Sequence, residues 1–310
     1  MKYSLSLCSI SALMLLLLSG QIGAGGRRAE ERLSLDEART VMLNLINRDR
    51  VANGLRTVTL DPIATVAGQK HTDEMVSRCY LAHWSLDGKL PDQRYTEMGG
   101  THFVQENLFL GMKYYGSKPD GDMPLDEDAT FTRRELEDIE LSYMNETPPN
   151  DGHRKNILDP MHVRVGIAFS RANNNRADVL ANAQEFLNKG SSMTEIPRRV
   201  SIGQTVNVSG KIEPGVRFRA ITLGRYDLPA SRSIDDLRRT HSYGMPTPFA
   251  VYCPEGYVTP EPVHVQENGT FNVRVALSDQ GAPGLYYITL WLRNEYGKDF
   301  ISSQRTVVVR

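Results

Sequence analysis

Cysteine is scarce in this sequence, which has three cysteines among 310 residues. So few cysteines cannot build the disulfide-rich scaffold of many small secreted domains. A charge excess is absent as well, because 36 basic residues are matched by 37 acidic ones. Dedicated nucleic-acid binders usually carry a basic face, so no nucleic acid is expected as a partner. With 40% hydrophobic and 24% charged residues the composition is globular, and the length suggests two domains of about 150 residues each.

Long apolar runs are missing after the first 24 residues. Residues 1–24 contain a run from Ile10 to Leu18, followed by small residues. This is the anatomy of a signal peptide, and the run is shorter than the roughly 20 residues that cross a bilayer. We therefore expect a mature chain that is secreted, extracellular or periplasmic, without a transmembrane segment. Cys8 leaves with the signal, and nothing predicts a bridge between the remaining Cys79 and Cys253.

Helical patterns dominate residues 33–188. Capping residues mark three helix starts, because their side chains satisfy backbone donors that a helix leaves unpaired. They are Ser34 with Glu37, Asp61 with Pro62, and Thr132 with Glu135. Apolar runs at 103–110, 163–170 and 179–187 predict three strands. Helices with a few strands indicate an α+β domain, in which helices pack on a small sheet.

Short strands between turns characterise residues 195–310. Phe271, Val273, Val275 and Leu277 alternate with polar residues, which predicts one buried strand face. Several such runs, punctuated by glycine and proline, predict an all-β sandwich of immunoglobulin-like type. The polar stretch from Asp227 to Pro246 interrupts this pattern, and we expect it to form a loop with one short helix.

Four short fragments of the first domain carry most of the functional information. In chain order they are His83 with Asp87-Gly88 and Arg94, then Glu106-Asn107, then Tyr143 with Glu146, then Gly152-His153-Arg154 with Asn156-Ile157-Leu158. The ordered set resembles the CAP superfamily of cysteine-rich secretory, antigen 5 and pathogenesis-related proteins, also called SCP-like. It is most similar to the bacterial secreted branch, which lacks the disulfides of the eukaryotic members. The resemblance covers about residues 35–188.

This resemblance implies an α-β-α sandwich with a shallow cleft, followed here by the C-terminal sandwich. In the family two histidines and two glutamates line the cleft, and in some members they hold a divalent metal. The matching positions are His83, Glu106, Glu146 and His153, with His83 and His153 as the metal ligands. The sequence departs from the family pattern at Gln105, Tyr143 and the inserted residues 147–151, which puts the cleft geometry in doubt.

The residue types of this tetrad also make chemical sense on their own. Neutral imidazole and carboxylate are ligands that zinc accepts, at roughly 2.0–2.2 Å. Glu146 follows Tyr143 by three residues, so we expect it in the last turn of the same helix, facing inward. The alternative is a buried hydrogen-bonded network that holds the helices to the sheet without any metal.

Other candidates in the first domain carry less weight. His71 and Glu74 lack the second histidine of an H-x-x-E-H zinc motif, so we interpret them as surface residues of a helix. His102 precedes Glu106 by four residues and is a possible auxiliary ligand on the same strand face. Cys79 has no recognisable base or oxyanion site nearby in the sequence, and we expect a small buried side chain.

Three hypotheses for function follow. The first is a secreted CAP-domain protein whose His/Glu cleft binds a small ligand, lipid or peptide, with or without a divalent metal such as zinc. The second is a metal-dependent, peptidase-like hydrolase in which Glu106 or Glu146 is the general base. The third is a cell-envelope adhesion module that contacts cell-surface or wall material through its C-terminal domain.

Overall fold

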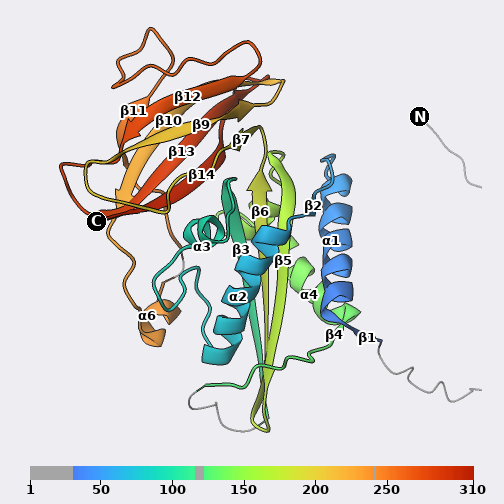
Figure 1. The fold of residues 1–310 in the computed structure, drawn as a ribbon. Coiled ribbons are helices and arrows are strands. Elements are labelled where there is room, and N and C mark those ends of the chain that lie inside the picture. The colour runs from blue at the N-terminus through green and yellow to red at the C-terminus, as the bar shows by residue number, and fades with distance from the viewer. Residues whose placement is uncertain (1–30, 116–121, 241) are drawn as a thin grey trace, which may run out of the picture. The chain divides into compact units, whose positions relative to one another are not determined.

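The computed structural model describes residues 31–115, 122–240 and 242–310. The predicted signal peptide at residues 1–24 lies outside them. Residues 32–188 contain a four-stranded sheet in the order β2-β5-β6-β3 (Figure 1). Its strands are β2 (Thr59–Leu60), β3 (Val104–Tyr114), β5 (His162–Asn173) and β6 (Ala177–Asn188), with β2 parallel and the others antiparallel to their neighbours.

Five helices accompany this sheet. They are α1 (Leu35–Ala52), α2 (Pro62–Arg78), α3 (Pro91–Glu97), α4 (Arg133–Met144) and α5 (Gly152–Ile157). Both predicted capping boxes are present, and the Asp61 side chain accepts from the backbone of Ala64 at the start of α2. A two-stranded pair, β1 (Arg32–Leu33) with β4 (Phe131–Thr132), joins the starts of α1 and α4.

The helices cover both faces of the sheet (Figure 1). Met42 of α1 and Leu136 of α4 share one core with Ile167 of β5, whereas Met75 of α2 packs with the next residue, Ala168. Neighbouring strand residues point to opposite faces, so the two cores lie on opposite sides of the sheet. Small residues let α2 approach closely. A Cβ at Gly166 would stand 2.4 Å from the backbone of Ala64.

Residues 191–309 form two further sheets. The first has the order β11-β10-β13-β14-β8 and the second β12-β9-β7. Their strands are β7 (Ser191–Met193), β8 (Arg199–Val200), β9 (Thr205–Ile212), β10 (Val216–Tyr226), β11 (Pro248–Tyr252), β12 (Thr270–Ala276), β13 (Gly284–Asn294) and β14 (Asp299–Val309). Side chains of both sheets share one hydrophobic core, which includes the predicted alternating set from Phe271 to Leu277.

The stretch between β10 and β11 contains the short helix α6 (Ile234–Arg238), as predicted. Strand β14 lies against the first part of the chain. Phe103 donates a backbone hydrogen bond to Ser302, and the Asn188 side chain donates to the carbonyl of Ile301 at 2.6 Å. Cys79 and Cys253 are not joined by a disulfide. None of the helices in the described ranges combines the length and apolarity needed to cross a membrane.

Candidate functional site

His83 and Glu106 form the first half of the candidate site. His83 lies on the loop after α2 and Glu106 lies on β3, and their Nδ1 and Oε2 atoms are 2.7 Å apart. The side chain of Glu106 is wholly buried, whereas that of His83 retains 17% of its exposure. The sequence analysis placed both residues in one cleft by resemblance, and the structure brings these two into direct contact.

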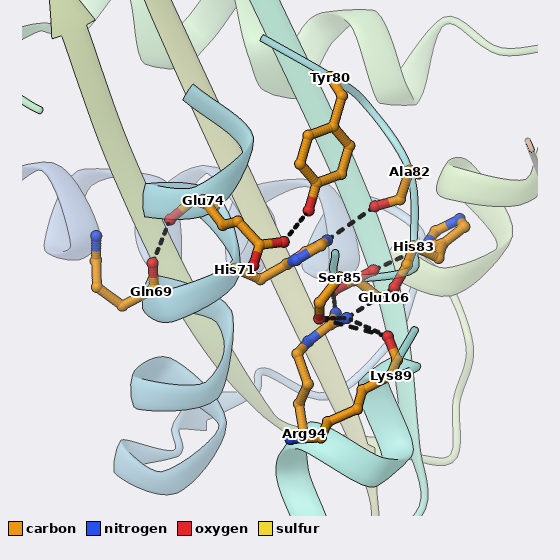
Figure 2. A network of polar contacts seen from close by, with 11 residues as sticks. Gln69, His71, Glu74, Tyr80, Ala82, His83, Ser85, Lys89, Arg94 and Glu106 are labelled. Atoms are coloured by element: carbon orange, nitrogen blue, oxygen red, sulfur yellow. Dashed lines mark hydrogen bonds and ion pairs between the residues drawn. The ribbon is translucent and has the colours of Figure 1, made fainter. Parts of the chain in front are cut away.

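Arg94 of α3 organises this half of the site (Figure 2). Its guanidinium forms an ion pair with Oε1 of Glu106 and donates to the carbonyl of His83 at 2.7 Å. The same group donates to the Ser85 hydroxyl and the Lys89 carbonyl, both at 3.2 Å. The buried Arg94 side chain therefore holds the loop of residues 83–89 in a fixed position relative to the Glu106 carboxylate.

The imidazole of His83 is neutral at pH 7. Burial lowers its pKa to about 4, and the nearby charge of Arg94 acts in the same direction. A neutral ring beside an ionised carboxylate donates from Nδ1, which leaves Nε2 as an acceptor. His83 therefore offers a lone pair to a ligand with a hydrogen-bond donor or to a metal ion.

A second buried acid, Glu185 of β6, stands directly across from Glu106 in the sheet register. Burial and the neighbouring Glu106 raise the pKa of Glu185 well above its ordinary value. Burial also raises the pKa of Glu106, but Arg94 opposes that effect. Both carboxyls are therefore harder to ionise than a free glutamate, and Glu106 has the Arg94 guanidinium beside it. The sequence analysis missed Glu185, although an acid within the apolar run 179–187 was a usable signal.

His153 and Glu146 form the second half of the site. The Nδ1 atom of His153 lies 2.5 Å from Oε1 of Glu146, and the Tyr143 ring packs on the imidazole with centroids 4.7 Å apart. The expectation that Glu146 lies in the last turn of α4 is wrong, because the helix ends at Met144. Glu146 instead accepts from the backbone N–H groups of His153 and Arg154 at the start of α5. A carboxylate is favourable there because helix N-termini carry partial positive charge.

The two residues that flank Glu106 on the edge strand β3 bond to α5, the helix that carries His153. Asn107 donates to the carbonyl of His153 at 3.1 Å, and Gln105 donates to Asn156 at 3.1 Å. Glu106 points to the face covered by α2 and α3, while its neighbour Asn107 points to the opposite face. The tetrad therefore forms two separate His–Glu contacts, His83 with Glu106 and His153 with Glu146.

This arrangement does not fit a single ion held by all four residues. Glu106 is committed to His83 and Arg94, and Glu146 to His153 and backbone amides. Across residues 31–115, 122–240 and 242–310 no three His, Cys, Asp or Glu side chains are grouped to hold a metal. Each carboxylate instead orients one imidazole through Nδ1, which is the usual outer partner of a metal-bound histidine.

A pocket of about 430 Å³ opens beside His83 and Glu106. Gln105, Asn156 and Asp92 contribute polar groups to its lining from the first part of the chain. Residues 242–245, Tyr287 and Gln304 line it from the second part. The Tyr243 ring meets the His83 ring edge to face, with centroids 5.0 Å apart. The pocket is therefore built by both parts of the chain.

Comparison with known families identifies the region of the chain that contains the helices and the four-stranded sheet. Residues 43–184 match the family model described as CAP, the cysteine-rich secretory protein family. The chain contains a CAP domain. No match was found among curated proteins.

Three solved structures are similar to parts of the chain. An extracellular protein containing a SCP domain from Bacillus anthracis is 15% identical, with a TM-score of 0.36 over 50% of this chain and 41% of that one. An outer surface protein from Borrelia burgdorferi is 14% identical, with a TM-score of 0.38 over 52% and 100%. A Niemann-Pick type C2 protein from Japanese carpenter ant is 12% identical, with a TM-score of 0.21 over 39% and 94%. This chain spans less than half the length of the Bacillus protein.

The segment between β10 and β11 is anchored on the CAP domain. Leu237 of α6 is fully buried in the core that contains Met75 and Tyr80, and Arg238 donates two hydrogen bonds to the Cys79 carbonyl. Arg232 stacks over the Trp84 ring at 4.8 Å. These contacts fix the two ends of the helical turn that precedes Tyr243.

Gly88 of the Asp-Gly motif has a specific reason to be glycine. Its φ of +80° is unfavourable for other residues, and a Cβ there would stand 2.3 Å from the carbonyl oxygen of Ala230. The segment between β10 and β11 can therefore pack against the loop that carries His83 only because Gly88 has no side chain.

The remaining sequence candidates have structural explanations. The interpretation of His71 and Glu74 as surface residues is wrong for His71, which is buried and bonded through Nε2 to the Ala82 carbonyl at 2.8 Å. Glu74 accepts from the Tyr80 hydroxyl and the Leu86 amide (Figure 2). His102 precedes β3, and the structure shows no bond between it and Glu106. Cys79 is buried, as expected.

Proposed function

We propose that this protein is a secreted binding protein that holds a small ligand beside His83 and Glu106 of its CAP domain. The observation that carries the proposal is the 430 Å³ pocket, which is lined by a neutral imidazole and a fixed carboxylate. Ligand sites are typically concave, with a few polar groups that fix orientation. Here the pocket and its polar groups are preformed, because Arg94 and the sheet hold the His83 loop and the Glu106 carboxylate in place.

Binding is favoured over hydrolysis because of how the carboxylates are engaged. A general base must accept a proton from water, yet both oxygens of Glu106 already have cationic or N–H partners. Glu146 is likewise occupied by the His153 ring and by two backbone amides. These groups position other parts of the site, which suits a rigid binding cleft.

A divalent metal on His83 and His153 is the second candidate, and with it a metal-dependent hydrolase. The observation in its favour is that each histidine is held by a carboxylate at Nδ1, so that Nε2 is the nitrogen available for coordination. A bound divalent ion would supply a Lewis acid at this cleft. The chain's own contribution would be the fixed orientation of the two imidazoles.

The proposal also includes the localisation of the protein and the boundaries of its domains. The signal-like residues 1–24 support secretion, and the bacterial branch of the family is the source that the sequence pattern favours. We assign residues 33–188 to the CAP domain and 195–310 to an immunoglobulin-like sandwich. The shared hydrophobic core of the two C-terminal sheets supports the second assignment.

The test is a binding screen with the purified protein against defined small metabolites, short peptides and lipids. NMR of the histidine ring resonances reports contact with His83, and the same samples are followed for product formation. We expect saturable shifts without turnover, weakened about tenfold or more in His83→Ala. Turnover that a chelator removes would instead support the hydrolase.

A matched control is His264→Ala, which removes another histidine from the second part of the chain. His264 does not line the pocket beside His83. Equal loss of binding in both variants would contradict a site at His83.

A further inference from the structure

Asp92 supplies a buried carboxylate to the pocket beside His83. It lies in the first turn of α3, after Pro91, and retains 6% of its exposure. It lines the pocket, and its Oδ1 atom has no hydrogen-bond partner among the described residues. Burial raises its pKa to about 6, although the Tyr287 hydroxyl, backbone amides at the start of α3 and the charge of Arg94 favour the ionised form. Asp92 is therefore ionised at neutral pH.

The Asp92 carboxylate is not paired with a cation in the lining of the pocket that the structure describes. Arg94 forms its ion pair with Glu106. No lysine or arginine is among the described residues that line the pocket. The pocket therefore presents a buried carboxylate with no cationic side chain in its described lining, and such a group favours a ligand of opposite sign.

Aromatic rings form part of the same lining. Phe103, Tyr243 and Tyr287 line the pocket together with Asp92. Both tyrosine hydroxyls stay protonated at neutral pH, because burial and the nearby carboxylates raise their pKa values well above the usual range. Aromatic faces attract organic cations, most strongly where water is excluded. Carboxylate and ring together suit an alkylammonium group better than a hydrated metal ion, which takes several oxygen ligands.

We propose that Asp92, with Tyr243 and Tyr287, makes this pocket a binding site for a small organic ammonium ion. The proposal rests on the proposed function and adds the chemical class of the ligand. The ammonium group sits beside Asp92, and its carbon chain lies against the rings. Tyr243 comes from the segment anchored by α6, so the C-terminal part of the chain determines which ligand the CAP domain accepts.

The experiment compares three probes of equal chain length with the full protein at pH 7.5. They are n-butylammonium, 1-butanol and butyrate, and binding is measured by ligand-observed NMR. Nα-acetyl-lysine amide is a fourth probe, because it presents the same ammonium chain on a peptide backbone. The variants are Asp92→Asn and Tyr243→Ala, with Tyr243→Phe and Asp138→Asn as controls. Asp138 is an exposed carboxylate on α4, so its loss changes net charge without touching the pocket.

We expect wild-type protein to bind n-butylammonium and to show no binding of 1-butanol or butyrate. Asp92→Asn should weaken ammonium binding about tenfold or more, since a charge-assisted contact is lost. Tyr243→Ala should weaken it several-fold, because the ring face is removed. Tyr243→Phe and Asp138→Asn should bind like wild type. Tyr243 is a half-buried residue of a surface segment, so its variants should fold. They therefore still measure the contribution of the site to ammonium binding if Asp92→Asn does not fold.

Equal binding of n-butylammonium and 1-butanol, or unaltered binding in Asp92→Asn, would overturn the inference. If His83-dependent binding is found only for neutral or anionic compounds, the inference fails and the proposed function stands. If neither these probes nor the screened compounds bind, both fail. Binding of the free amine but not of the lysine derivative would restrict the ligand to small molecules, and binding of both would admit a lysine side chain.

Discussion

Glu106 of β3 and Glu185 of β6 face each other across adjacent antiparallel strands, and both carboxyls are buried. Side chains in such positions have Cβ atoms about 4.5–5.5 Å apart, so two negative charges there would repel strongly. The Arg94 guanidinium pairs with Glu106, and burial together with Glu106 raises the pKa of Glu185 well above its ordinary value. The site thus depends on a balance among three buried ionisable groups.

The first prediction concerns that balance. Glu185→Gln should change the free energy of unfolding by less than about 1 kcal/mol, because glutamine has the shape and neutrality of the protonated acid. Glu106→Gln should cost about 3–5 kcal/mol, because it leaves the Arg94 guanidinium buried without its counter-charge. Urea denaturation at pH 7 measures both. Equal losses would show that Glu185 is ionised in the folded protein.

The sequence anticipated the elements around this site well, because their signals are local. The capping boxes at Ser34 and Thr132 and the alternation after Phe271 all appear where expected. The mixed helix and strand composition and the CAP domain are confirmed. The placing of His83 and Glu106 in one cleft came from an ordered motif and not from any local rule.

What the sequence missed depends on contacts between distant residues. Glu185 is significant only because the register places it opposite Glu106. Tyr243 reaches His83 only because Leu237 docks in a core some 160 residues away in the chain. His71 resembled a surface residue because its motif is polar, yet its ring bonds to the carbonyl of Ala82 in the interior. No periodicity argument reports such tertiary packing.

The second prediction concerns pH and Glu140 of α4. This side chain is fully buried and accepts from Gln184 at 2.8 Å, and burial raises its pKa to about 7. A carboxyl with a raised pKa favours the folded state at low pH, and this contribution is lost as pH rises from about 4.5 through 7. The loss is on the order of 3 kcal/mol. Glu140→Gln should therefore be more stable than wild type at pH 8 and similar to it near pH 4.5.

Urea denaturation at both pH values tests this expectation. Glu137→Gln is the control, because Glu137 is exposed on the same helix and should leave the pH dependence of wild type unaltered. A Glu140→Gln variant that is destabilised to the same extent at both pH values would show that the buried acid does not titrate in this range.

The third prediction concerns the anchor of the segment that carries Tyr243. Leu237→Ala leaves a cavity in the core beside Met75, at a cost of about 2–5 kcal/mol if α6 stays docked. Release of α6 costs less than global unfolding, so we expect faster amide hydrogen exchange in residues 228–246 and little change in β5 and β6. Leu141→Ala, an exposed position on α4, should show neither effect. Uniformly faster exchange would instead mean that the segment and the CAP domain unfold as one unit.

The fourth prediction separates the two roles that the glutamates can have toward a metal. If zinc binds through Nε2 of His83 and His153, the double variant His83→Ala/His153→Ala should lose it. Glu146→Gln should weaken zinc binding only about 10- to 100-fold, because Glu146 holds the His153 ring and does not ligate. Mass spectrometry of the protein after equilibration with zinc measures bound metal, and competition with a chelator gives the affinities.

Loss of zinc in Glu146→Gln as complete as in the double variant would make the glutamate a direct ligand, which would require the loop after α4 to rearrange. Zinc no higher in wild type than in the double variant would leave His83 and Glu106 as part of the wall of a metal-free pocket.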